Sequence, residues 1–275
     1  MRFRTIGLLA FLAVLGALPM TAARADTSWD TTGSYTTTVA GTLKHEGLAS
    51  TDPNMIRYGN QIEFQSGGSP LYATSYFVTS NSSTSTLQTA NIEVYQGSGY
   101  GIGVTSKTVG SYIEDVGNSP GHTVDNQGVY DLVAFQLPSA NFDVTKITLN
   151  TFSTSQYPSG RADFTVFVGG NSLVTSLSSL AGVTLGSLTS TYGFTELNYS
   201  SATDGTFNVN SGNIAGQYLI VAASLTNTSK NDDFKIAQVV GQSSTRVPEP
   251  STLLVFASGA IMLAGFSRKR RSPRC

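Results

Sequence analysis

The residues best suited to chemistry lie in one polar block between Gly101 and Phe135. Asp125 and Asn126 occupy a predicted turn, and Asp131 opens the strand that follows it. Ca²⁺ takes about six to eight oxygen ligands, and backbone carbonyls can complete such a shell. Asp and Asn side chains also organise turns by bonding to nearby backbone groups. Two interpretations are therefore open: a Ca²⁺ site on Asp125, Asn126 and Asp131, or a turn that needs no metal.

Catalytic patterns find less support in the sequence. Gly117–Gly121 fits the Gly-x-Ser-x-Gly pattern of hydrolases, but Pro120 follows the serine and has no N–H for an oxyanion. His45 and His122 have no neighbouring set of zinc ligands. Four glutamates on or near predicted strands could supply the paired carboxylates of a glycoside hydrolase: Glu63, Glu93, Glu114 and Glu196. We expect no enzymatic activity, and a secreted polysaccharide hydrolase is one alternative.

Aromatic side chains suggest a second alternative, a carbohydrate-binding module. The candidates for a sugar-stacking face are Trp29, Tyr58, Tyr72, Tyr95, Tyr100 and Tyr130. Aromatic rings on strands more often pack in the core, with the Tyr hydroxyl or Trp N–H reaching a polar partner. Exposure of these rings decides between the two roles.

Short β-type runs must position these residues. Runs rich in Val, Ile, Thr, Tyr and Phe recur between Gly, Asn, Ser and Pro clusters. They predict strands at 34–43, 55–64, 71–78, 90–95, 101–105, 129–137, 144–151, 163–168, 191–199, 206–209, 218–225 and 234–240. The pattern predicts an all-β, two-sheet sandwich of jelly-roll type, with the strand at 163–168 buried on both faces. A short helix is expected within residues 172–188, and residues 80–86 read as a surface loop.

Composition limits the possible partners. Residues 26–247 hold eight Lys and Arg against sixteen Asp and Glu, a formal net charge near −8. Such a region repels nucleic acid, so we expect no nucleic-acid partner. The one cysteine of the chain is Cys275, so this region has no disulfide and relies on its packed core.

The N-terminus has the three parts of a secretory signal peptide. Arg2 and Arg4 give a positive start, and Ile6–Leu18 is a short apolar run. Ala23-Arg24-Ala25 is a small-x-small cleavage site. We expect signal peptidase to cut between Ala25 and Asp26, which makes residues 1–25 a leader.

The C-terminus has a polar box, an apolar run and a basic end. Pro248, Glu249 and Pro250 precede an apolar run of 14 residues from Leu253 to Phe266. The flanking Ser and Thr residues extend a helix to 251–267, which reaches the lower limit of about 17 residues for crossing a bilayer. Basic residues at 268–274 would stay on the cytoplasmic side.

This three-part tail at 248–275 resembles the PEP-CTERM sorting signal of exosortase substrates. The resemblance implies that Pro248, Glu249 and Pro250 are the recognition box and that exosortase cuts near them. It also implies a transient anchor in the inner membrane and a mature protein at the cell surface or outside the cell.

The remaining sequence divides into an ectodomain at 26–241 and a linker at 242–247. His122–Gly128 and Asp233–Ile236 resemble parts of a β-sandwich ectodomain found among PEP-CTERM surface proteins. We expect a non-catalytic surface or matrix protein, and the resemblance to this class implies a role in exopolysaccharide and biofilm.

Overall fold

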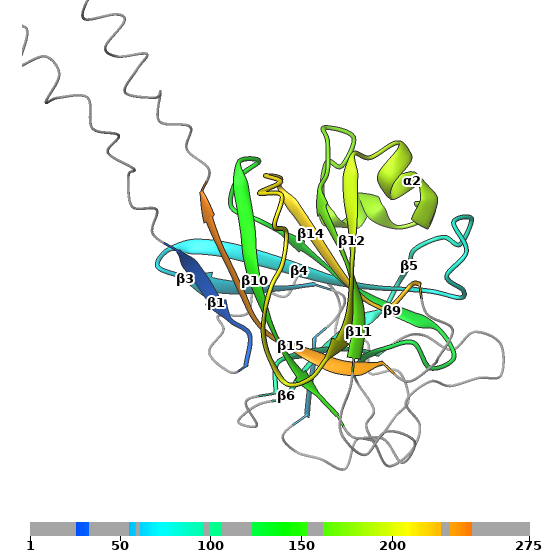
Figure 1. The fold of residues 1–275 in the computed structure, drawn as a ribbon, viewed down its shortest axis with the longest axis horizontal. Helices are drawn as coiled ribbons and strands as arrows, with labels where there is room; N and C mark the ends of the chain where they lie inside the picture. Colours follow the sequence, from blue (N-terminus) through cyan, green and yellow to red (C-terminus); the bar gives the residue numbers. More distant parts are fainter. Residues whose placement is uncertain are drawn as a thin grey trace, which may run out of the picture. The chain divides into compact units, whose positions relative to one another are not determined.

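The computed structural model describes residues 26–32, 55–58, 61–95, 100–105, 123–152, 162–226 and 232–243. In this part of the chain, most regular structure is β-strand, in two antiparallel sheets packed face to face (Figure 1). The predicted two-sheet sandwich is confirmed. It lies within a compact unit that spans Ala25–Ser244.

The first sheet, sheet A, is organised around its last strand, β15 (Asp233–Ser243). Its order is β13 (Gly205–Asn208), β10 (Phe142–Thr151), β15, β7 (Ile102–Thr105), β6 (Asn91–Tyr95) and β2 (Met55–Tyr58). Strand β10 pairs along one edge of β15. The other edge is shared by β1 (Thr27–Asp30), β7 and β8 (Val124–Asp125) in succession. The first described strand is therefore paired with the last.

The second sheet, sheet B, holds strands from the middle of the chain. Its order is β12 (Phe194–Ala202), β11 (Ala162–Gly169), β14 (Tyr218–Ala223), β9 (Tyr130–Gln136), β4 (Ser69–Val78) and β3 (Gln61–Ser66). A short strand, β5 (Gln88–Thr89), also pairs with β4. The chain passes from sheet B to sheet A between β12 and β13, where Asp204 accepts hydrogen bonds from the backbone N–H and the hydroxyl of Thr151.

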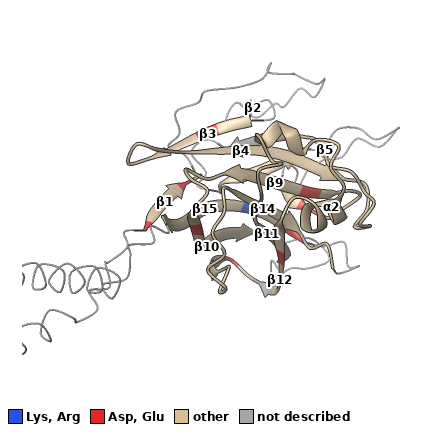
Figure 2. Ribbon diagram, turned by 90° about the horizontal axis from the view of Figure 1, so that it is seen from above, with Lys and Arg blue, Asp and Glu red and all other residues tan. Residues whose placement is uncertain are grey.

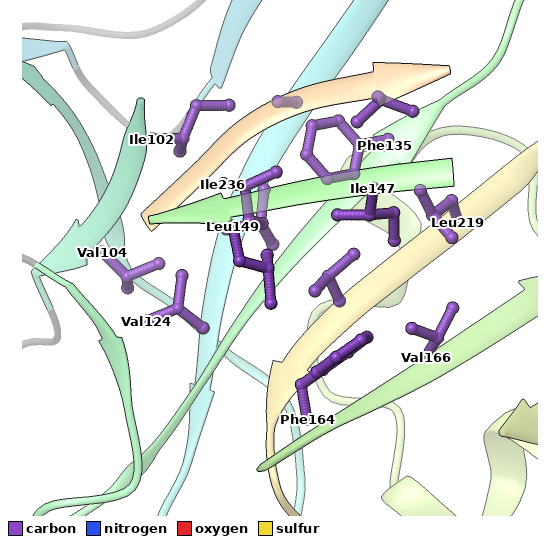
Figure 3. Packing of buried hydrophobic residues seen from close by; sticks show 14 of the residues in the cluster. Ile102, Val104, Val124, Phe135, Ile147, Leu149, Phe164, Val166, Leu219 and Ile236 are labelled. Atoms are coloured by element: carbon purple, nitrogen blue, oxygen red, sulfur yellow. The ribbon is translucent and has the colours of Figure 1, made fainter. Parts of the chain in front are cut away.

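An apolar core fills the space between the sheets. Figure 3 shows Ile147, Leu149 and Ile236 of sheet A beside side chains of sheet B such as Phe135 and Phe164. All of these side chains are fully buried. Each contributes about 1.5–3 kcal/mol of burial free energy, so this core stabilises a domain that has no disulfide.

A second apolar cluster covers the outer face of sheet B. It packs η1 (Leu177–Leu180) and α2 (Leu185–Ser190) against β4, β9 and β14. The Tyr76 hydroxyl donates to the carbonyl of Leu177, and the Tyr218 hydroxyl donates to that of Val174 at 3.1 Å. Burial raises the pKa of both tyrosines. This cover explains why β11 is buried on both faces, as its sequence predicts.

The strand predictions were wrong at several short segments. The run predicted as one strand at 55–64 is two strands, β2 in sheet A and β3 in sheet B. Gly59-Asn60, a turn-forming pair, separates them in the sequence. β1, β5 and β8 were not predicted because they are short and mostly polar. β15 continues to Ser243, two residues into the segment predicted as a linker.

The predicted strand at 34–43, the leader and the sorting tail, including the helix at 251–267, fall outside the described residues. None of the helices in the described ranges has the length and hydropathy to span a bilayer.

Candidate functional site

The turn after β8 is held by its own side chains. Asp125 accepts a hydrogen bond from the backbone N–H of Gln127 at 2.8 Å through one carboxylate oxygen. The other oxygen accepts from the hydroxyl of Thr123 at 3.2 Å. Pairing of β8 with β15 places Asp125 directly opposite Asp233, and both residues are buried. Asp125 therefore has the turn-organising role that the sequence left open.

Asn126 ties this turn to the start of β15 through Asp232. Its amide nitrogen donates to the Asp232 carboxylate at 2.6 Å, and its amide oxygen accepts from the Asp232 backbone N–H at 3.1 Å. The second oxygen of Asp232 accepts from the backbone N–H of Asp163 at 2.7 Å. One carboxylate thus joins the ends of three segments that are far apart in the chain.

Asp232 is not among the functional residues that the sequence predicts. The only local signal was the Asp232-Asp233 pair immediately before a predicted strand. Its partner Asn126 is 106 residues away, so no spacing pattern could have identified it.

Asp131 lies on the other sheet from Asp125. On β9, Val133 belongs to the core between the sheets, whereas Tyr130 and Leu132 belong to the outer cluster. Strand alternation therefore directs Asp131 toward the inside of the sandwich. On β8, Val124 belongs to the inner core, so Asp125 faces the outside of sheet A.

Metal binding by these residues stays a prediction. The structure brings Asp125 and Asn126 into one turn and places Asp131 across the sandwich on β9. Among the residues that the structure describes, no three His, Cys, Asp or Glu side chains are grouped so that they could hold a metal ion. A Ca²⁺ ion at this turn would need Asn and backbone oxygens for much of its shell.

The two described glutamates cannot form a glycosidase pair. Glu63 is on β3 and Glu196 is on β12, at opposite edges of sheet B. Five strand spacings of about 4.8 Å separate these edges by roughly 24 Å. Paired catalytic carboxylates stand about 5–9.5 Å apart. The side chain of Glu93, the whole of Glu114, and His45 and His122 lie outside the described part.

Of the four predicted sugar-stacking aromatics whose side chains the structure describes, three are buried or half-buried. Trp29 has 0% of its surface exposed, packs against Phe142 at 5.3 Å between ring centroids, and donates from Nε1 to the carbonyl of Ser69 at 2.9 Å. Tyr130 is buried, and Tyr72 is half-buried against the outer cluster. Of the two roles that the sequence left open, Trp29 and Tyr130 therefore have core packing, because both rings fill apolar cores. Nothing is described of the side chains of Tyr58 and Tyr95.

Among the members of that set whose side chains the structure describes, Tyr100 has an exposed ring, at 46% exposure. Its carbonyl accepts a hydrogen bond from the Asn150 side chain at 3.0 Å. Its ring meets the ring of Phe152 edge-on, with 5.4 Å between centroids. The Nζ atom of Lys235 lies 5.9 Å from the centroid of Phe152. Tyr100 is therefore held in place over the outer face of β10 and β15.

The processing residues flank the sandwich closely in sequence. Asp26 is exposed and precedes β1 by one residue, so a cut after Ala25 would leave β1 whole. Register pairing places Thr27 opposite Gly241 near the end of β15. The residues Ala25, Pro248, Glu249 and Pro250 lie outside the described ranges.

Comparison with known families matches residues 246–271 to the PEP-CTERM protein-sorting motif. The match contains the predicted box at Pro248, Glu249 and Pro250 and marks the chain as an exosortase substrate. The chain is thus an exported protein that is sorted to the cell surface and processed by exosortase. Comparison with curated proteins finds no match.

Proposed function

We propose that this protein is a non-catalytic β-sandwich of the cell surface or extracellular matrix, where it associates with exopolysaccharide in biofilm. The observation that carries the proposal is the sorting motif at 246–271, which starts three residues after the last strand ends at Ser243. A cut near the Pro-Glu-Pro box would remove the tail and leave β15 intact.

The pairing of the two terminal strands supports removal of the leader and the tail without loss of the fold. β1 starts at Thr27 and pairs with the C-terminal half of β15. Removal of the leader at Ala25 and of the tail near Pro248 would therefore leave every described strand in place. A domain built in this way suits release from two temporary anchors into a place where it remains folded without disulfides.

The described side chains support a role in binding or scaffolding. The carboxylates of Asp125 and Asp232 are engaged in holding turns together. Glu63 and Glu196 lie too far apart for acid and base to flank one glycosidic bond. This arrangement favours a stable module that presents a surface.

Export and sorting can be tested in the native host. Pro248→Ala combined with Glu249→Ala should leave an uncut precursor that sediments with the inner membrane. The matched control is Ser244→Ala with Thr245→Ala, two substitutions just outside the matched residues. Normal release of the Pro248/Glu249 variant would overturn the sorting role of the box.

The matrix role needs a separate readout. A strain that lacks the protein should form biofilm with less retained exopolysaccharide, and the wild-type protein should co-fractionate with the matrix. If the protein is released normally but none of it is in the matrix, the biofilm part of the proposal fails and the sorting part stands.

A further inference from the structure

The outer faces of the two sheets differ in what covers them. On sheet B, η1 and α2 pack over the strands and bury their outward side chains. On sheet A, outward polar side chains are partly or fully exposed on β13, β10 and β1 and at Gln238 and Gln242 of β15, whereas Asp233, Lys235 and Val240 of β15 are buried. Figure 2 shows few Lys and Arg or Asp and Glu positions on the described ribbon. The accessible part of this face therefore presents hydrogen-bonding groups and few charges.

Four polar side chains form a row across this face. Strand register places Thr206, Thr148, Gln238 and Asp30 directly opposite one another, in that order, on four neighbouring strands. Their neighbours Phe207, Leu149, Val239 and Trp29 face the inner core, so the row points outward. We call these four residues the polar row.

Direct hydrogen bonds order part of the polar row. The hydroxyls of Thr148 and Thr206 lie 2.8 Å apart, and the Thr148 hydroxyl donates to the Gln238 side-chain oxygen at 3.3 Å. Three strand spacings of about 4.8 Å give the row a length of roughly 14 Å. It offers hydroxyl, amide and carboxylate groups along one line, which suits an extended oligosaccharide better than a small ion.

Tyr100 borders the polar row at one end of the sheet. Asn150, which binds its carbonyl, is two residues along β10 from Thr148 and so lies on the same face. The distance along the strand is about 6.6 Å. The Tyr100 ring is thus an exposed apolar surface beside a line of hydrogen-bonding groups, the combination that polar ligands with one apolar face require.

We propose that the outer face of sheet A binds a neutral polysaccharide through the polar row and the ring of Tyr100. Sugar hydroxyls donate to and accept from Thr, Gln and Asp side chains, and the C–H face of a sugar ring packs on tyrosine. A neutral chain fits because Lys235 is buried under this face, and the two accessible charges near the row, Asp30 within it and Lys146 beside Thr148 on β10, are opposite in sign. The inference rests on the proposed matrix function and gives it a binding surface.

The test uses mature protein released by the native host. Its mobility is measured in native gels that contain the neutral polysaccharide fraction of the host matrix, with dextran sulfate gels as the anionic comparison. The wild type should be retarded by the neutral fraction and not by dextran sulfate. Tyr100→Ala should weaken binding about tenfold, and Thr148→Val several-fold.

Three further variants separate binding from folding. Leu173→Ala is the matched control, because Leu173 is 55% exposed and lies outside this face, next to the cover of sheet B. It should bind as the wild type does. Tyr100→Phe keeps the ring and should retain most binding, whereas Asn150→Ala should weaken binding by releasing the Tyr100 backbone. Melting temperatures close to wild type establish that each variant is folded.

Several results would overturn the inference. They are equal binding by wild type, Tyr100→Ala and Thr148→Val, retardation by dextran sulfate alone, or no retardation in either gel. The proposed function is judged separately by fractionation. A Tyr100→Ala protein that is cut normally but remains in the medium supports the binding face, and one that enters the matrix normally removes the binding face without affecting exosortase sorting.

Discussion

Trp29→Ala should cause a large loss of stability, because this side chain joins the two sheets. Trp29 is on β1, three residues after the expected mature N-terminus at Asp26, and its ring is fully buried. Its Nε1 donates to the carbonyl of Ser69 on β4, so one side chain of sheet A holds a strand of sheet B. The ring also packs against Phe142. Loss of this side chain removes core volume and a bond between the sheets together.

The size of the effect follows from these contacts. Replacement of a buried Trp by Ala costs about 3–5 kcal/mol. The unsatisfied Ser69 carbonyl adds about 1 kcal/mol. The total of roughly 4–6 kcal/mol is a large part of the 5–15 kcal/mol that stabilises an ordinary domain. Trp29→Phe keeps an aromatic ring but loses the N–H donor, and should cost about 1–2 kcal/mol.

Urea unfolding of the mature protein, followed by far-ultraviolet circular dichroism, measures these changes. With a slope of about 2–3 kcal/mol per M, the midpoint should fall by roughly 1.3–3 M for Trp29→Ala. Leu173→Ala should shift it little, because that side chain is exposed. A loss below about 1 kcal/mol for Trp29→Ala, with an unchanged slope, would refute the claim that β1 is an integral strand.

Three further predictions concern the backbone, the tyrosines and the turn. Gly101 has φ +98°, and a Cβ there would collide with the backbone of β15, so Gly101→Ala should lower the unfolding free energy by about 3 kcal/mol or more. Gly182 has φ +83° but faces open space, so Gly182→Ala should cost about 1 kcal/mol. Similar losses for the two variants in urea unfolding would contradict this prediction. Burial raises the pKa of Tyr76 and Tyr218 above the value of about 10 that tyrosine has in the unfolded chain. The contribution of these tyrosines to the unfolding free energy should therefore be constant below pH 10 and decrease as the pH rises above it. Tyr76→Phe should flatten this dependence in thermal melts from pH 9 to 11. Asn126→Ala should destabilise the protein by about 2–3 kcal/mol, because the buried Asp232 carboxylate loses a hydrogen-bond donor. The loss should be the same with and without chelator. If chelator alone lowers the melting temperature of the wild type, that result would instead support a Ca²⁺ ion at Asp125, Asn126 and Asp131.

The longer strands could be predicted from the sequence because their own residues carry the signal. β9, β11 and β14 are mostly apolar runs, and both of their faces are buried. β1 and β8 could not be predicted, because two to four mostly polar residues become strands only when β15 provides an edge to pair with. Local propensity has no information about that partner.

The candidate site was only partly predictable for a similar reason. Asp125 organises its turn through neighbours within two residues, which a local pattern can indicate. The bond between Asn126 and Asp232 depends on the sheet that brings them together. Exposure of aromatic rings was equally inaccessible: Trp29 and Tyr100 are both in polar sequence surroundings, yet one is in the core and the other is on the surface.

Peptide mapping of the mature protein from the native host tests the central claim most directly. Digestion and mass spectrometry of the surface and released fractions define both ends of the chain. Signal peptidase cleavage predicts an N-terminus at Asp26. Exosortase processing predicts a C-terminus near the Pro-Glu-Pro box, with no peptide from the apolar run Leu253–Phe266. Recovery of that run and of the basic end to Arg274 in the mature surface protein would contradict the account.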